Sequence, residues 1–137
     1  MSQMNVNAQK CMVDWLHEHD HSNISTNKTN QFDIVCTVDQ DLPRILYEVE
    51  VNYSWQGEWP ETWEEVFISE EKAKPLEKWS KECPDDILTF VVFCNDLKKA
   101  WHIDGSTLLE CAVRNKFFCI STSDAYLMDM TYDESGR

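Results

Sequence analysis

The stretch from Phe32 to Tyr53, FDIVCTVDQDLPRILYEVEVNY, decides the fold. Apolar residues alternate with polar ones along two short runs. In the first run the apolar positions are Phe32, Ile34, Cys36 and Val38, and in the second they are Ile45, Tyr47, Val49, Val51 and Tyr53. A period of two over this length is typical of half-buried strands, so the stretch predicts two neighbouring strands joined by a turn.

The pairing of these two strands is predicted from the requirement that both apolar rows share one face of the sheet. The register that satisfies it pairs Phe32 with Val51, Ile34 with Val49, Cys36 with Tyr47, and Val38 with Ile45. It leaves residues 40–43 as the connection, which is an ordinary length for a β-hairpin loop.

The same register brings acidic side chains together on the opposite face. Asp33 lies directly across from Glu50, with Cβ atoms roughly 4.5–5.5 Å apart. Glu48 lies on that face too, one strand repeat of roughly 6.8 Å away. Because neighbouring carboxylates repel one another unless a proton or a cation intervenes, and because hard oxygen ligands suit Mg²⁺ or Mn²⁺, the pattern predicts a divalent metal site.

An Asp on one strand and a Glu-x-Lys on the next resemble the core of the PD-(D/E)xK nuclease superfamily. Here the matching residues are Asp33 and the tripeptide Glu50-Val51-Asn52. The resemblance implies a Mg²⁺-dependent or Mn²⁺-dependent endonuclease that hydrolyses nucleic-acid phosphodiester bonds. It implies that Asp33, Glu50 and the Val51 carbonyl hold the metal, with Glu48 either behind these ligands, in their hydrogen-bonding surroundings, or as a ligand of a second metal.

The sequence departs from the family at Asn52, which stands where the family carries its catalytic lysine. An amide cannot act as the same general acid or positive charge. In some members of the superfamily the lysine has moved to the following helix, and Lys72 or Lys74 would take that place. The alternative is that these lysines belong to a solvated helix face and balance the neighbouring glutamates.

The rest of the chain is predicted to form helices and further strands around this hairpin. Before the hairpin we expect a helix over residues 4–18 and an irregular edge strand within 22–30. After it we expect a short buried segment at 66–68, and a helix that begins at 69 and restarts at Pro75 before it ends near 82. A central strand over 87–94, a strand over 97–103, a helix of about ten residues capped by Ser106, and late strands or an edge hairpin at 117–120 and 125–130 are predicted to follow. The result is an α/β (α+β) fold in one domain, residues 1–137. It has a single mixed β-sheet flanked by helices, with the restriction-endonuclease-like order αβββαβ and an extra C-terminal helix and strands.

Charge and composition restrict the partners. The chain has 12 Lys and Arg against 25 Asp and Glu, a formal net charge of −13, so nucleic-acid binding is disfavoured although a local basic strip or a protein partner would allow it. No apolar run is long enough to span a membrane, and no secretory signal is visible, so we expect a cytoplasmic protein. The oligomeric state is left open.

Three functions therefore remain open from the sequence. The first is a metal-dependent endonuclease. The second is a catalytically inactive nuclease fold that serves as a binding module. The third is an acidic interaction protein, such as a nucleic-acid mimic that occupies basic sites on a partner.

Overall fold

The computed structural model of the chain describes residues 3–18, 24–25, 34–36 and 44–130. Its elements, in order, are α1 (Gln3–Glu18), β1 (Ile24–Ser25), β2 (Ile34–Cys36), β3 (Ile45–Val51), β4 (Glu65–Ser69), α2 (Glu70–Glu82), β5 (Ile87–Phe93), β6 (Lys99–Asp104), α3 (Gly105–Glu110), β7 (Val113–Arg114), β8 (Phe117–Ser121), a 3₁₀ turn (Thr122–Asp124) and β9 (Tyr126–Asp129).

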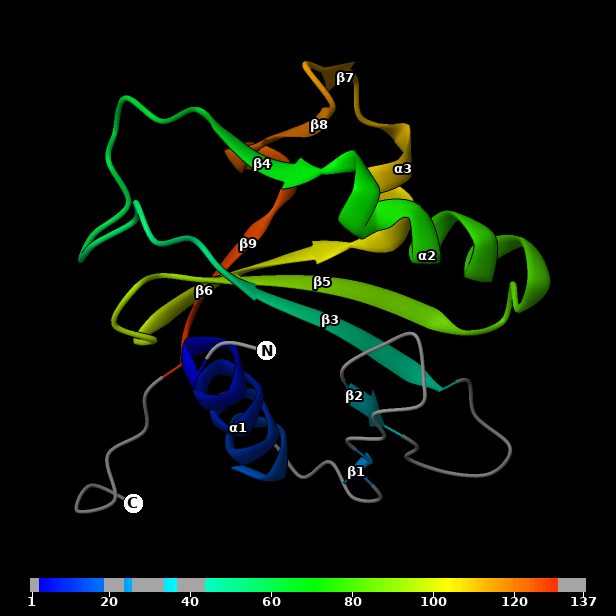
Figure 1. Ribbon diagram of the computed structural model, residues 1–137, viewed down its shortest axis with the longest axis horizontal. Helices are drawn as coiled ribbons and strands as arrows, with labels where there is room; N and C mark the ends of the chain where they lie inside the picture. The colour runs from blue at the N-terminus through cyan, green and yellow to red at the C-terminus, as the bar shows by residue number, and fades with distance from the viewer. Residues whose placement is uncertain (1–2, 19–23, 26–33, 37–43, 131–137) are drawn as a thin grey trace.

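A mixed sheet forms the centre of the molecule. Six strands lie in the order β1-β2-β3-β5-β6-β9, with β3 and β5 parallel and the other neighbours antiparallel. In Figure 1, α1 lies below this sheet, while α2 and α3 lie above it. The predicted α/β fold, a mixed sheet flanked by helices, is therefore confirmed. A second, three-stranded sheet in the order β4-β8-β7 lies above the first and was not predicted.

Each face of the central sheet carries its own hydrophobic core, and β5 contributes to both. Phe90 and Val92 belong to the core under α2, α3 and the second sheet, whereas Val91 and Phe93 belong to the core under α1. All four side chains are buried. The near-continuous apolar sequence of β5 is thus explained, because a strand that is covered on both faces has no solvated row.

The hairpin register predicted from the sequence is wrong by two residues. Ile34 pairs with Tyr47 and Cys36 pairs with Ile45, rather than with Val49 and Tyr47. A shift of two keeps every side chain on its predicted face, and hydrophobic alternation therefore cannot distinguish these two registers. The predicted pairing of Asp33 with Glu50 belonged to this register and is not supported by the pairing of the described residues. Asp33 itself and the loop at 40–43 lie outside the described residues.

The two later helices also differ from their predictions. α2 is one continuous helix that contains Pro75, and the Ser69 side chain makes no capping hydrogen bond. Burial of Ala73 and Leu76 on the core holds the helix together on both sides of the proline, because tertiary packing supplies most of the stability of a helix in a protein. α3 has only six residues, and the backbone becomes extended at Cys111, where it turns toward β7.

The last strands form no hairpin with each other. β8 pairs with β4 and β7 in the second sheet, whereas β9 pairs with β6 at the edge of the central sheet. The segment predicted to be buried at 66–68 is strand β4, in which Val66 and Ile68 are buried but Phe67 is 54% exposed. A strand with one covered face exposes every second side chain, and Phe67 lies in the exposed row. Among the described residues, no helix combines the length and the hydropathy that a bilayer crossing needs.

Gly105 provides a direct test of how closely α3 packs on β5. A Cβ atom at this position would lie 2.8 Å from Leu88 Cβ and 3.2 Å from Leu88 O. We expect Gly105→Ala to lower the free energy of unfolding by roughly 1–3 kcal/mol, because α3 must move away from the sheet. Urea denaturation measures the loss, with Ser106→Ala, an exposed neighbour on the same helix, as the control. Equal stability of the two variants would contradict this packing.

Candidate active site

The acidic residues of β3 point toward the side of the sheet that α2 covers. Glu48 and Glu50 lie on the same face as Leu46, and they are level with Phe90 and Val92 on the neighbouring strand β5. Only 16% of the Glu50 side chain is exposed, and the Oε2 atom of Glu48 is buried. Two carboxylates are therefore held beside apolar side chains, where a charge is poorly solvated.

A lysine from α2 reaches this pair of acids. Nζ of Lys72 lies 3.4 Å from Oε2 of Glu50. Lys72 is the third residue of α2, which begins directly after β4. The start of this helix therefore brings a lysine into contact with Glu50, near the end of β3. The Lys72 side chain is 52% exposed and therefore lies at the solvent side of the site.

The surroundings of Glu50 disfavour its charged form. Burial raises the pKa of the Glu50 carboxyl above its ordinary value, and the Lys72 ammonium offsets only part of that rise. A cation beside Glu50 stabilises the carboxylate, and in this structure the cation is Lys72.

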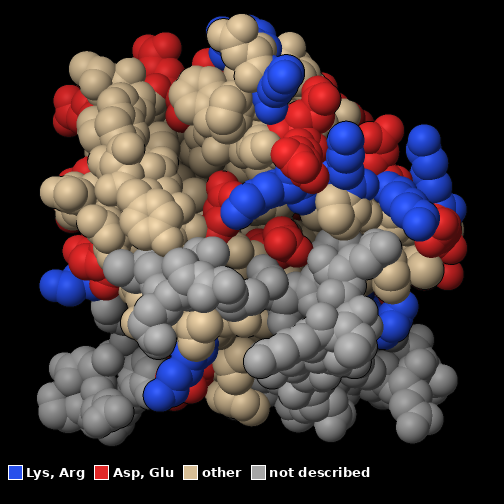
Figure 2. All heavy atoms as spheres, viewed as in Figure 1, with Lys and Arg blue, Asp and Glu red and all other residues tan. Residues whose placement is uncertain are grey.

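The structure distinguishes between Lys72 and Lys74, the two lysines that the sequence offered as partners of the acidic residues. Lys72 contacts Glu50, whereas none of the ion pairs between described residues includes Lys74. Lys74 is exposed on α2. Figure 2 shows basic side chains gathered over α2, with acidic side chains beside them. Of the two, only Lys72 is placed to act together with Glu50.

Asn52 stabilises the turn at the end of β3. Its Oδ1 atom accepts a hydrogen bond of 2.9 Å from the Ser54 amide, and its carbonyl accepts one of 3.2 Å from the Trp55 amide. These two bonds form the turn that leaves the strand. The residue at the family's lysine position therefore shapes the backbone, and its side chain also lines a cavity described below.

The described residues do not by themselves form a metal site. They include no group of three or more His, Cys, Asp or Glu side chains that is placed to hold an ion. Asp33, the second predicted carboxylate ligand, lies outside the described residues. The backbone N–H of Asn52 donates a hydrogen bond to Phe93 O on β5. The Val51 carbonyl belongs to the same peptide group and points the opposite way, toward the edge of β3 that pairs with β2. Glu50 and Val51 carry oxygen atoms of the kind that Mg²⁺ and Mn²⁺ prefer as ligands.

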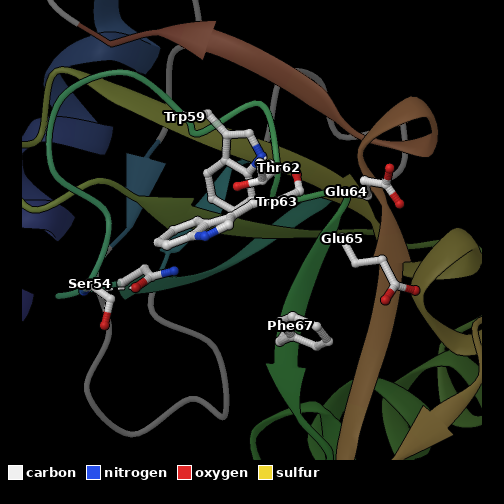
Figure 3. A pocket seen from close by; sticks show the side chains of 8 residues that line it. Ser54, Trp59, Thr62, Trp63, Glu64, Glu65 and Phe67 are labelled. Atoms are coloured by element: carbon white, nitrogen blue, oxygen red, sulfur yellow. Dashed lines mark hydrogen bonds between the residues drawn. The ribbon is translucent and has the colours of Figure 1, made fainter.

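A cavity of about 460 Å³ opens next to this site and was not predicted. Figure 3 shows Trp63 on one side of it and Phe67, from β4, on another. The lining comes from the end of β3, from the segment at 54–64 and from β4, which follow one another directly in the sequence. The signal in the sequence was the group of aromatic residues Trp59, Trp63 and Phe67, because exposed tryptophans can stack bases. The sequence alone favoured a structural role for the tryptophans, since Glu residues surround them and Pro60 interrupts any helix.

Removal of the Lys72 charge tests its electrostatic contact with Glu50. We expect the pKa of Glu50 to rise further in Lys72→Met, because the group that offsets the effect of burial is lost. Lys74→Met should leave that pKa unchanged. A pH titration of the side-chain carboxyl carbons by NMR measures both variants, and an equal pKa in the two would contradict the contact.

In comparisons with known proteins, the chain matches no protein-family model and no curated protein sequence. The resemblance to PD-(D/E)xK nucleases therefore depends on the motif residues and on the order of the elements.

Proposed function

We propose that the chain is a metal-dependent phosphodiesterase of the PD-(D/E)xK endonuclease type, with its active site at Glu50. The observation that carries the proposal is the contact between Lys72 on α2 and Glu50 on β3, at 3.4 Å. A nuclease of this type needs a positive side chain beside its metal-binding carboxylates. Asn52 cannot supply it, and Lys72 supplies it from the following helix.

Glu50, the Val51 carbonyl and Asp33 are the residues that would hold Mg²⁺ or Mn²⁺ in this proposal. Glu48, one strand repeat from Glu50 on the same face, would adjust the charge of the site or contribute to a second ion. A divalent ion at such a site supplies a nucleophilic hydroxide and stabilises negative charge on the phosphate.

Lys72 has a separate role toward the substrate. Half of its side chain is in solvent, so the ammonium group can leave Glu50 and bind a phosphate oxygen when a divalent ion replaces it. An ammonium group suits this task, since it is a compact point charge with three donors on a flexible stem. Lys72 would thus hold the scissile phosphate next to Glu50.

Because the net charge is −13, a nucleic-acid substrate can be attracted only by a local group of basic side chains. α2 carries basic residues at four positions: Lys72, Lys74, Lys78 and Lys81. They supply the basic side chains that Figure 2 shows over this helix. Because the rest of the chain repels phosphates, we expect weak nucleic-acid binding that falls steeply with salt, or a basic protein partner that assists it.

A nicking assay tests the proposal. Supercoiled plasmid and single-stranded DNA and RNA are incubated with the protein in Mg²⁺, in Mn²⁺ and in EDTA. Cleavage should require the metal, should be lost in Asp33→Asn and Lys72→Met, and should persist in Lys74→Met. Metal binding without cleavage would instead select an inactive nuclease fold that serves as a binding module. Absence of both would favour an acidic interaction protein.

A further inference from the structure

The cavity beside the candidate active site is lined by aromatic rings that are partly exposed to solvent and are not part of the buried core. Trp63 is 37% exposed and Phe67 is 54% exposed, although both belong to residue types that folding normally buries. Both line the same cavity of about 460 Å³, which is large enough for a single aromatic ring system. Two rings left open to solvent around one hollow provide surfaces on which a flat ligand can stack.

The position of Trp63 is fixed by a group of tryptophans behind it. Trp59 makes edge-to-face contacts with Trp55, Trp63 and Trp101, at centroid distances of 5.0, 5.1 and 5.4 Å. Its Nε1 atom donates a hydrogen bond of 2.7 Å to the Trp63 carbonyl. Trp55 is fully buried, so this group is anchored in the core. The Trp63 ring therefore stands in place before any ligand arrives, which lowers the entropic cost of binding.

Neutral hydrogen-bonding groups complete the lining. The Asn52 carboxamide is oriented by the bond from the Ser54 amide to its Oδ1 atom, and its NH₂ group supplies two donors. Thr62 adds a hydroxyl group. In Figure 3 the carboxylates of Glu64 and Glu65 are directed away from the Trp63 ring, and Glu65 forms an ion pair with Arg114 on β7. The interior thus offers stacking surfaces and amide or hydroxyl contacts, as the edge of a nucleobase requires.

The cavity also lies at the right place along β3. Asn52 follows Glu50 on the same face of the strand, one repeat of roughly 6.8 Å further on. A ring held against Trp63 and Asn52 would leave its attached sugar and phosphate within reach of Glu50 and Lys72.

We infer that this cavity binds a nucleobase of a single-stranded substrate, stacked on Trp63 and Phe67 and contacted at its edge by the Asn52 amide. The inference rests on the proposed phosphodiesterase function, which it deepens by naming an unpaired base as the feature recognised beside the cleaved phosphate. In this arrangement Asn52, at the position of the family's lysine, contacts the base and stabilises the turn after β3. Lys72 provides the positive charge beside Glu50.

Binding of neutral nucleosides without metal tests the inference, because neither Glu50 nor a phosphate is then involved. Adenosine, guanosine, cytidine and uridine are titrated into the ¹⁵N-labelled full chain, and the shifts of the indole and Asn52 side-chain signals are followed by NMR. We expect saturable shifts in the wild type and in Glu50→Gln. Affinity should fall on the order of tenfold in Trp63→Leu, the effect of removing one base-stacking surface.

Two further variants complete the test. Asn52→Asp retains an acceptor for the Ser54 amide but loses the NH₂ donors, so it should weaken binding or change the base preference while the fold is kept. Tyr126→Leu removes an aromatic residue that is 61% exposed on β9, away from the cavity, and should bind as the wild type does. Wild-type affinity in both Trp63→Leu and Asn52→Asp would overturn the inference. So would tighter binding of tetramethylammonium, a small organic cation that aromatic rings also attract, than of any nucleoside.

The two proposals fail in different ways. If nucleosides bind in the cavity but no variant or metal gives cleavage, the phosphodiesterase function fails and the base site stands alone. If the wild type cleaves single strands while nucleosides do not bind and Trp63→Leu cleaves normally, the base site fails alone.

Discussion

Replacement of Glu50 by glutamine should make the protein more stable at neutral pH and remove its metal-dependent cleavage. Glutamine has the same shape and no charge, so the cost of holding a carboxylate beside apolar side chains is lost. A gain of about 1 kcal/mol in the free energy of unfolding is the usual size when a residue held for function is replaced. Cleavage should fall by on the order of 100-fold or more, because a ligand of the proposed metal is removed.

The pH dependence of this gain follows from the raised pKa of Glu50. Burial raises the pKa in the folded state above the value in the unfolded chain, and the acidic Glu48 and the basic Lys72 are the charged groups nearest on β3 and α2. The folded protein is therefore favoured while Glu50 is protonated, and that stability is lost as the pH rises through the folded-state pKa. The advantage of Glu50→Gln over the wild type should accordingly grow as the pH rises from the ordinary carboxyl pKa through the folded-state pKa of Glu50, and then stay level.

Guanidinium denaturation of the two proteins across this pH range measures the difference. Glu71→Gln, an exposed neighbour on α2, removes the same charge from the surface and is the control. An advantage that stays constant with pH, or that Glu71→Gln shares, would contradict the buried position of Glu50.

Phe90→Ala should cause one of the largest losses of stability among single substitutions in the core. Phe90 is fully buried at the centre of β5, where it lies between Glu48 on β3 and Ile103 on β6. Truncation of such a ring costs about 3–5 kcal/mol, since it removes apolar contacts and leaves a cavity. Total stabilities of small domains are about 5–15 kcal/mol, so the variant would lie near the limit of folding.

Thermal unfolding followed by circular dichroism tests this loss. Phe67→Ala removes the same atoms from a ring that is 54% exposed, and it should cost less than about 1 kcal/mol. Similar melting temperatures for the two variants would contradict the assignment of Phe90 to the core.

The central sheet could be predicted from the sequence because its strands have distinct patterns. Alternation placed Ile34, Tyr47 and Val49 on one face, and the continuous apolar run of β5 placed that strand in the middle. The pairing register could not be predicted, since a shift of two residues preserves every face. The second sheet was missed because its strands are short and because β4 lies far in the sequence from β7 and β8.

The candidate site was predicted only in part, for similar reasons. Lys72 and Lys74 are two residues apart, about 200° around a helix, so at most one of them faces the sheet. The sequence did not decide between them, because a predicted break at Pro75 hid the orientation of the helix. Once α2 is continuous and Leu76 is buried, Lys72 lies one turn before it on the sheet side. The cavity beside Asn52 is lined by one stretch, residues 52–67, but its shape depends on how the chain turns between β3 and β4, which the residue pattern does not determine.

Titration of the full chain with Mn²⁺, followed by electron paramagnetic resonance of the free ion, tests most directly whether Glu50 and Asp33 form one metal site. We predict one saturable site in the wild type and in Glu71→Gln, with affinity reduced on the order of 10–100-fold in both Asp33→Asn and Glu50→Gln. Unchanged Mn²⁺ affinity in either of these two variants, or no saturable binding by the wild type, would contradict the proposed active site.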